Sequence, residues 1–248
     1  MVPSDNAYAQ VIDVIGLGGT GSWLVRALTP YLDSPTGPEG PPRFVGKLVL
    51  VDGDDYESAN RGRQHFPKIG NKAAVLAEAV NHTTTHFTTR GLAVYLGREV
   101  SEGPHRSTPI RDVVGEGHTV FVCVDNHATR KLVFEHAATL RNVVVLSAGN
   151  DYDDGNVMLY VRKEGKDLCP NPLSYQEDIR DAAGKLPGQM SCEELAANGT
   201  PQLIAANLWA ATLLLSAYHA YTSGKLDTKS PIVYFDVNKL TAAPRQRS

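Results

Sequence analysis

The sequence VIDVIGLGGTGS, residues 11–22, combines a short apolar strand, a tight glycine turn and the start of a helix. Gly16, Gly18 and Gly21 match the G-x-G-x-x-G pattern of nucleotide-binding turns, and Gly19 adds a further glycine. Glycine lets backbone N–H groups approach a phosphate, and the helix N-terminus offers unpaired donors beside it. The motif predicts a phosphate-bearing ligand, and a glycine turn without a ligand is the alternative.

Strand and helix patterns alternate outward from this turn. Apolar, β-branched runs predict strands over residues 11–15, 47–52, 87–95, 118–124 and 142–147, and helical patterns cover residues 22–32, 71–81 and 126–140. This alternation predicts an α/β, Rossmann-like fold with a mostly parallel sheet and helices on both faces. Ligands of such folds bind outside the carboxyl ends of the strands.

The character of the sequence changes after Gly149. Residues 156–162 and 232–237 predict further strands, whereas residues 163–200 are polar, rich in Pro and Gly and weakly periodic. We therefore expect one domain over residues 1–248. Residues 10–150 would form its nucleotide-binding core, and residues 151–248 would add a long loop, an apolar helix and terminal strands.

The uncharged run from Leu203 to Ser223 is about one bilayer thickness long as a helix. Polar residues interrupt it at Asn207, Thr212, Ser216 and His219. A buried or interface helix is therefore expected rather than a membrane span.

Composition and charge limit the function classes. A net charge of −3 over 248 residues, without a basic run, argues against a nucleic-acid-binding surface. The N-terminus lacks a basic region followed by an apolar core, so we predict no secretory signal and expect a cytoplasmic protein. Three widely spaced cysteines do not form a disulfide framework.

Polar and cationic side chains follow the second predicted strand. Asp52 ends that strand, where a carboxylate can accept hydrogen bonds from a ribose diol. The residues downstream that could bind phosphate are Asn60, Arg61, Arg63, Gln64, Lys68 and Lys72. This set suits a triphosphate better than a nicotinamide, and a solvated basic loop is the alternative.

The combination of GLGGTGS, VDGDDYESANRGRQ, Lys72 and CVDNHATR resembles the adenylation domain of ThiF, MoeB and HesA proteins and of ubiquitin-activating enzymes. The resemblance covers residues 10–150 and, more weakly, SCEELAANGTPQLIAANLWAA. The chain's size and its proline-rich loop SPTGPEGPP are similar to ThiF-like proteins of plasmid-borne PRTRC systems. The resemblance implies ATP- and Mg²⁺-dependent adenylation of the C-terminal carboxylate of a small ubiquitin-like or sulfur-carrier protein.

The resemblance also implies roles for individual residues. The nucleotide-binding set would be Gly16, Gly18, Gly19, Gly21, Asp52, Asp54, Asn60, Arg63, Gln64 and Lys72. The catalytic set would be Arg63, Lys72, Asp125 and Cys192. Asp125 would place Mg²⁺, which prefers oxygen ligands. The alternative is that Asp125 or Asn126 only caps the helix that follows.

Cys192 stands at a position similar to the ThiF crossover-loop cysteine, where an activated carboxyl can pass to sulfur. The neighbouring Glu193 and Glu194 do not favour a thiolate, and an incidental loop cysteine is an equal alternative. Cys123 is expected in the core, and the role of Cys169 stays open.

The chain departs from family patterns in two ways. It has no paired C-x-x-C motif, so no structural zinc is expected. MoeB-like relatives carry an N-terminal arginine that reaches the partner's site, whereas no arginine here precedes Arg26, and Arg61 is a candidate substitute. Because the family usually works as a homodimer packed around the C-terminal apolar helix, a homodimer is expected.

Two other functional classes also fit the glycine turn. A nicotinamide-dependent oxidoreductase would explain the glycine turn and Asp52 but not the phosphate-binding residues from Asn60 to Lys72. A non-catalytic ATP-binding scaffold would bind ATP without catalysing pyrophosphate exchange. No nucleic-acid or membrane partner is predicted.

Overall fold

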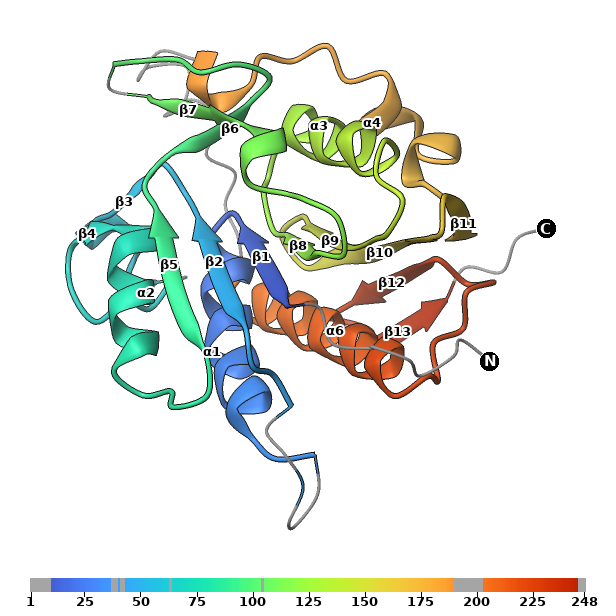
Figure 1. Cartoon of the computed structure of the whole chain (residues 1–248), viewed down its shortest axis with the longest axis horizontal. Helices are drawn as coiled ribbons and strands as arrows, with labels where there is room; N and C mark the ends of the chain where they lie inside the picture. The colour runs from blue at the N-terminus through green and yellow to red at the C-terminus, as the bar shows by residue number, and fades with distance from the viewer. Residues whose placement is uncertain are drawn as a thin grey trace.

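The computed structural model describes residues 10–36, 40, 43–62, 64–103, 105–189 and 203–244. Its central sheet contains five parallel strands in the spatial order β9-β8-β1-β2-β5 (Figure 1). These strands are β1 (Val11–Ile15), β2 (Lys47–Val51), β5 (Thr88–Leu92), β8 (Thr119–Val122) and β9 (Val143–Asn150). The predicted α/β fold with a mostly parallel central sheet is confirmed.

The C-terminal part of the chain extends this sheet with antiparallel strands. β10 (Asp154–Lys163) pairs with β9, β12 (Ile232–Asp236) pairs with β10, and β13 (Thr241–Pro244) forms the outer edge. β11 (Lys166–Cys169) also pairs with β10. Two small ribbons join β3 (Asp55–Tyr56) to β4 (Gly70–Asn71) and β6 (Tyr95–Gly97) to β7 (Ser107–Pro109).

Helices cover both faces of the sheet, as predicted. α1 (Gly19–Asp33), α2 (Lys72–Asn81) and α6 (Ile204–Thr222) bury apolar side chains against one face, in a core that includes Ile12 and Val14 of β1. α3 (His127–Ala137) and α4 (Glu177–Arg180) cover the other face, with Ile15 and Val122 beneath them (Figure 1). Single-turn helices are η1 (Ser58–Asn60), η2 (Ile110–Asp112), η3 (Pro172–Ser174) and η4 (Pro187–Gln189).

Two boundaries differ from the predictions in ways that affect the site. α1 begins at Gly19 rather than at Ser22, so the glycine turn contains the first turn of the helix. β9 continues to Asn150, because Gly149 and Asn150 still pair with β10. Both differences arise where glycine weakens the sequence signal for a regular element.

The segment predicted as a loop, residues 163–200, is structured over its described part, which contains β11, η3, α4 and η4. The proline-rich loop SPTGPEGPP, residues 34–42, is described only at residues 34–36 and 40. α6 buries Ala210, Leu214 and Tyr218 against the sheet and α1, as expected for a buried helix. Within the described residues, no helix has the length and apolar character needed to cross a membrane.

Candidate active site

A cavity of about 950 Å³ opens at the carboxyl ends of the parallel strands. One end is formed by the glycine turn, by residues that follow β2 and by Lys72. The cavity continues past Asp125 and Arg130 to the strands β10, β12 and β13. This volume lies near the upper end of the range for small-molecule sites, roughly 300–1,000 Å³, so it has room for more than a nucleotide.

Each glycine of the turn has a separate structural reason. Gly16 adopts φ +85°, and a Cβ there would lie 2.9 Å from the backbone of Cys123. A Cβ on Gly21 would lie 1.9 Å from the carbonyl oxygen of Gly16, so this glycine lets α1 approach β1. Gly19 leaves room for the side chain of Asn207 on α6.

Gly18 differs because it lines the cavity with open space around the position of a Cβ. A Cβ there would meet nothing nearer than Gln64 Nε2 at 3.8 Å. Gly18 is the N-cap of α1 and supplies no side-chain cap, so the first-turn N–H groups are left for a ligand. This arrangement suits a phosphate group.

Asp52 lies at the end of β2, where two backbone donors hold its carboxylate. The N–H of Leu17 donates to Oδ2, and the N–H of Asp54 donates to Oδ1 at 2.8 Å. Burial raises the pKa of Asp52 to about 6, Asp54 contributes to the rise, and Lys72 opposes it. The carboxylate is therefore fixed in position between the glycine turn and the cavity, as the predicted ribose contact requires.

Lys72 is the first residue of α2, and its side chain reaches the same cavity. Its Nζ donates to Oδ2 of Asp54 at 3.1 Å, and the side chain is only 7% exposed. Burial lowers the pKa of Lys72, but the negative charges of Asp52 and Asp54 outweigh burial and raise it. The hydroxyl of Tyr95 also donates to Asp54. The structure thus places a buried cation beside the cavity.

The polar residues predicted downstream of Asp52 do not all reach the cavity. Gln64 lines it and is 5% exposed, and its Oε1 has no hydrogen-bond partner within the described part of the chain. Asn60 also lines it, although its Oδ1 already accepts from the N–H of Glu57. Arg61 is exposed and does not line the cavity, and Lys68 pairs with Glu78 instead. Arg63 lies outside the described residues.

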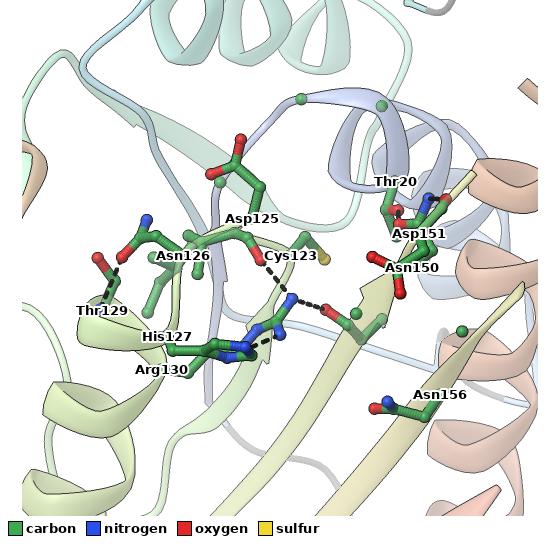
Figure 2. Close-up of a pocket in the computed structure, with 18 of the residues that line it drawn as sticks. Thr20, Cys123, Asp125, Asn126, His127, Thr129, Arg130, Asn150, Asp151 and Asn156 are labelled. Atoms are coloured by element: carbon green, nitrogen blue, oxygen red, sulfur yellow. Dashed lines mark hydrogen bonds between the residues drawn. The ribbon is translucent and has the colours of Figure 1, made fainter. Parts of the chain in front are cut away.

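Asp125 and Asn126 have separate roles. Asn126 is the N-cap of α3, and its Oδ1 accepts from the N–H of Thr129 at 2.8 Å. Asp125 is exposed, lines the cavity and forms no hydrogen bond with another described residue. Figure 2 shows its carboxylate pointing away from Arg130. The helix cap is therefore Asn126, which leaves the carboxylate of Asp125 for a ligand.

Arg130 is a site residue for which the sequence predicted no role. Its Nη2 donates to the carbonyl oxygens of Val124 at 2.7 Å and Ala148 at 3.0 Å, after β8 and within β9 (Figure 2). It leaves no space for a side chain at Gly149, where a Cβ would lie 2.7 Å from Nη1. Arg130 belongs to the quoted motif CVDNHATR, one turn of helix after Asn126, and that spacing was the available signal.

A second unpredicted feature is a network of polar side chains beneath the glycine turn. Thr20 donates to Asn150 Oδ1 at 3.1 Å, and Asn150 donates to Asn207 Oδ1 at 3.1 Å. Asn207 is fully buried on α6. The sequence signal for this role was an amide side chain in a helix expected to be buried, because a buried amide requires a partner.

The described cysteines are both buried. Burial raises the pKa of the Cys123 thiol to about 12, as expected for a residue of the core. Cys169 is also fully buried, and its thiol donates to the carbonyl oxygen of Leu159. Neither thiol suits a nucleophile, and Cys192 lies outside the described residues.

The glycine turn, the buried Asp52 and the buried Lys72 give this α/β protein a cavity with the features of a nucleotide site. The model of the ThiF family matches residues 7–206, and the chain belongs to this family. The resemblance found in the sequence is confirmed. A comparison with curated proteins gives no match.

Solved structures with the same fold include two ThiF-like proteins. MccB of E. coli with ATP matches at 16% identity and a TM-score of 0.62, over 95% of this chain and 63% of MccB. MccB with AMPCPP and MccA matches at 17% identity and a TM-score of 0.65, over 97% of this chain and 64% of MccB. PaaA matches at 13% identity and a TM-score of 0.65, over 95% of this chain and 63% of PaaA. The chain thus spans just under two thirds of the length of each.

Proposed function

We propose that this protein is an ATP-dependent adenylating enzyme that activates the C-terminal carboxylate of a peptide or small protein, of the ubiquitin-like or sulfur-carrier kind. One observation carries the proposal. The phosphate-binding features at the glycine turn and Lys72 share a cavity with a second region that reaches β12 and β13. Such a cavity can hold a nucleotide and the end of a polypeptide at the same time.

Adenylation requires little covalent chemistry from the protein. A carboxylate oxygen attacks the α-phosphorus of ATP, the bond to the bridging oxygen breaks, and pyrophosphate leaves. A C-terminal carboxyl, with a pKa near roughly 3.5, is already ionised at neutral pH, so no general base is required. The barrier lies in bringing two anions together, and Lys72 and Arg63 would lower it by neutralising phosphate charge.

Magnesium fits the residues present. Mg²⁺ takes oxygen ligands and is bound by one or two carboxylates together with phosphate oxygens. Asp125 offers an exposed carboxylate on the cavity wall. When bound, the ion would neutralise phosphate charge, and Asp125 would hold it on this side of the cavity.

The comparisons support this proposal. MccB has been solved with ATP and also with MccA, which is consistent with a nucleotide and a polypeptide occupying one site in this fold. Family membership favours ATP over a nicotinamide cofactor. The proposal extends to thioester transfer onto Cys192 and to a homodimer packed through α6, on which Ile204 and Leu208 are 39% and 40% exposed. We place the protein in the cytoplasm.

The test is ATP–pyrophosphate exchange by the purified protein, measured with and without small proteins encoded beside it. Exchange that depends on one of these proteins, together with ATP binding and no NAD binding, is the expected result. ATP binding without exchange under any condition would identify a scaffold instead, and NAD binding would identify an oxidoreductase.

A further inference from the structure

The network of polar side chains beneath the glycine turn connects three elements of the fold. It consists of Thr20, the second residue of α1, Asn150, the last residue of β9, and Asn207 of α6. Figure 2 shows Thr20 and Asn150 side by side on the cavity wall. Asn207 is fully buried and does not line the cavity.

Hydrogen bonds hold the side chain of Asn150 in one orientation. Its Nδ2 donates to Oδ1 of Asn207 at 3.1 Å and to the carbonyl oxygen of Asp151 at 3.3 Å. Its Oδ1 accepts from the hydroxyl of Thr20 at 3.1 Å. Oδ1 of Asn207 also lies 3.3 Å from that hydroxyl, so one atom of Asn207 contacts both α1 and β9. The network thereby ties the first turn of α1 to the end of β9.

Stability alone does not account for an asparagine at position 207. Its Nδ2 is buried and has no hydrogen-bond partner within the described part of the chain, and an unsatisfied buried donor costs stability. Ala206 and Ala210, its buried neighbours on α6, are apolar. The amide also requires a glycine opposite it, because a Cβ on Gly19 would lie 2.2 Å from Nδ2. A buried amide with these costs indicates a role beyond packing.

The two elements that the network ties together border different parts of the cavity. Gly18 and the first turn of α1 form the phosphate-binding end. β9 leads through a turn into β10, whose Asn156 and Met158 line the part that continues toward β12. Reacting atoms must lie about 3–3.5 Å apart, and a misplacement of about 1 Å can reduce a rate about a hundredfold. The position of α1 relative to β9 therefore affects the alignment of two bound substrates.

We propose that Asn207 is a positioning residue, which acts through Thr20 and Asn150 to hold the first turn of α1 in a fixed position relative to β9. In the reaction it would align the α-phosphate of ATP with the carboxylate of the polypeptide, and this part of the inference rests on the proposed function. Because Asn207 is fully buried, it is not placed to contact either substrate. Each substrate keeps its own binding residues when Asn207 is replaced, so the replacement should lower kcat and leave KM for ATP unchanged.

The test is steady-state pyrophosphate exchange with ATP and the small protein that supports exchange by the wild type. Asn207→Leu replaces the amide with an apolar group of the same branching, and it should reduce kcat about a hundredfold with KM for ATP within about twofold of the wild type. Thr20→Val should also lower kcat, whereas Thr20→Ser keeps the hydroxyl and should retain most of it. The double variant Asn207→Leu/Thr20→Val should be no slower than Asn207→Leu, since residues that act as one unit are not additive.

Thr222→Val is the matched control. Thr222 lies at the end of the same helix, is 9% exposed, and donates its hydroxyl proton to the carbonyl oxygen of Tyr218 at 3.1 Å. This variant loses a buried hydroxyl, as Thr20→Val does, but at a position that does not line the cavity, and it should keep the wild-type kcat. Thermal unfolding of every variant reports whether it is folded.

Amide hydrogen exchange tests the link between α1 and β9 without any substrate. In the ligand-free protein, Asn207→Leu should accelerate exchange by at least about tenfold over residues 16–24 and 147–151, because both segments lose a buried hydrogen-bond partner. Thr222→Val should leave exchange in both segments at the wild-type rate.

The outcomes separate this inference from the proposed function. An unchanged kcat in folded Asn207→Leu, or a rise in KM for ATP as large as the fall in kcat, overturns the inference and leaves adenylation standing. Full additivity of the two substitutions also overturns it. If Asn207→Leu does not fold, the comparison of Thr20→Val with Thr20→Ser decides in the same way. If the wild type catalyses no pyrophosphate exchange, adenylation fails, and amide exchange then decides: acceleration in both segments supports the link between α1 and β9, and its absence overturns it.

Discussion

Nζ of Lys72 lies 3.1 Å from Oδ2 of Asp54, and this contact joins the start of α2 to the turn after β2. The hydroxyl of Tyr95 donates to the other oxygen of Asp54. Lys72 is thereby held in the cavity with its charge retained, because the carboxylates of Asp52 and Asp54 raise its pKa against the effect of burial. A cation fixed before the ligand arrives does not have to reorganise during the reaction.

Lys72→Ala should reduce pyrophosphate exchange by at least about a hundredfold, because it removes a preorganised positive charge from the phosphate site. The matched control is Lys68→Ala, which removes an exposed lysine paired with Glu78 away from the cavity. Thermal unfolding of both variants reports whether each is folded. Equal exchange by the two folded variants would show that Lys72 has no part in the chemistry.

Much of this site follows from local sequence, and the rest does not. The glycine turn, Asp52 and Lys72 lie within or beside strongly patterned segments, so their shared position at the carboxyl ends of the strands could be predicted. The contact of Asn150 with Asn207 joins residues 57 positions apart and depends on how α6 packs across β9. Arg130 likewise donates to one carbonyl after β8 and one within β9, a contact that no periodicity in the sequence reveals.

Gly21→Ala should reduce stability, whereas Gly18→Ala should reduce ATP affinity. A Cβ at Gly21 would lie 1.9 Å from a backbone oxygen, so this variant should lose about 3 kcal/mol of unfolding free energy or fail to fold. At Gly18 the nearest atom is 3.8 Å away, so the variant should fold normally and bind ATP more weakly. Urea unfolding and ATP titration measure the two effects. A loss of stability in Gly18→Ala with normal ATP affinity would contradict a phosphate role for this glycine.

Asp125→Asn and Asn126→Ala should separate metal binding from helix capping. Asp125→Asn should raise the Mg²⁺ concentration needed for half-maximal exchange by about tenfold or more, with little change in stability. Asn126→Ala removes a helix cap and should cost about 1 kcal/mol of stability with an unchanged Mg²⁺ requirement. A Mg²⁺ titration of each variant decides the matter, and an unchanged requirement in Asp125→Asn removes the metal role.

The raised pKa of Asp52 predicts a pH dependence of ribose binding. Protonation below about 6 removes the charge that attracts the ribose hydroxyls, so adenosine should bind more tightly as pH rises from about 5 to about 8. Adenosine is the probe because it carries no phosphate that titrates in this range. Asp52→Asn should bind adenosine weakly and without this pH dependence. Adenosine binding to the wild type that does not change with pH would refute the ribose contact of Asp52.

The same ionisation affects stability with the opposite sign. Because the folded pKa of Asp52 is raised, its contribution to stability is complete below the unfolded value of 3.8 and is lost as pH rises through about 6. Between pH 3.8 and about 6, urea unfolding should therefore show a decrease in the unfolding free energy of the wild type. Asp52→Asn should not show this decrease.

Cys192 should be the thiol that forms a conjugate with the activated partner, since Cys123 and Cys169 are buried. The expected product is a thioester that is cleaved by dithiothreitol and absent in Cys192→Ser. Adenylate formation without such a conjugate in the wild type would restrict the enzyme to adenylation.

The most direct test of adenylation follows the oxygen atoms of the substrate carboxylate. The enzyme is incubated with ATP, Mg²⁺, hydroxylamine and a small protein that supports pyrophosphate exchange. The C-terminal carboxylate of this small protein is labelled with oxygen-18. Attack of that carboxylate on the α-phosphorus, followed by attack of hydroxylamine on the carbonyl carbon, leaves one labelled oxygen in AMP and yields the hydroxamate. We predict labelled AMP by mass spectrometry, whereas label in inorganic phosphate with release of ADP, or no transfer of label, would contradict adenylation.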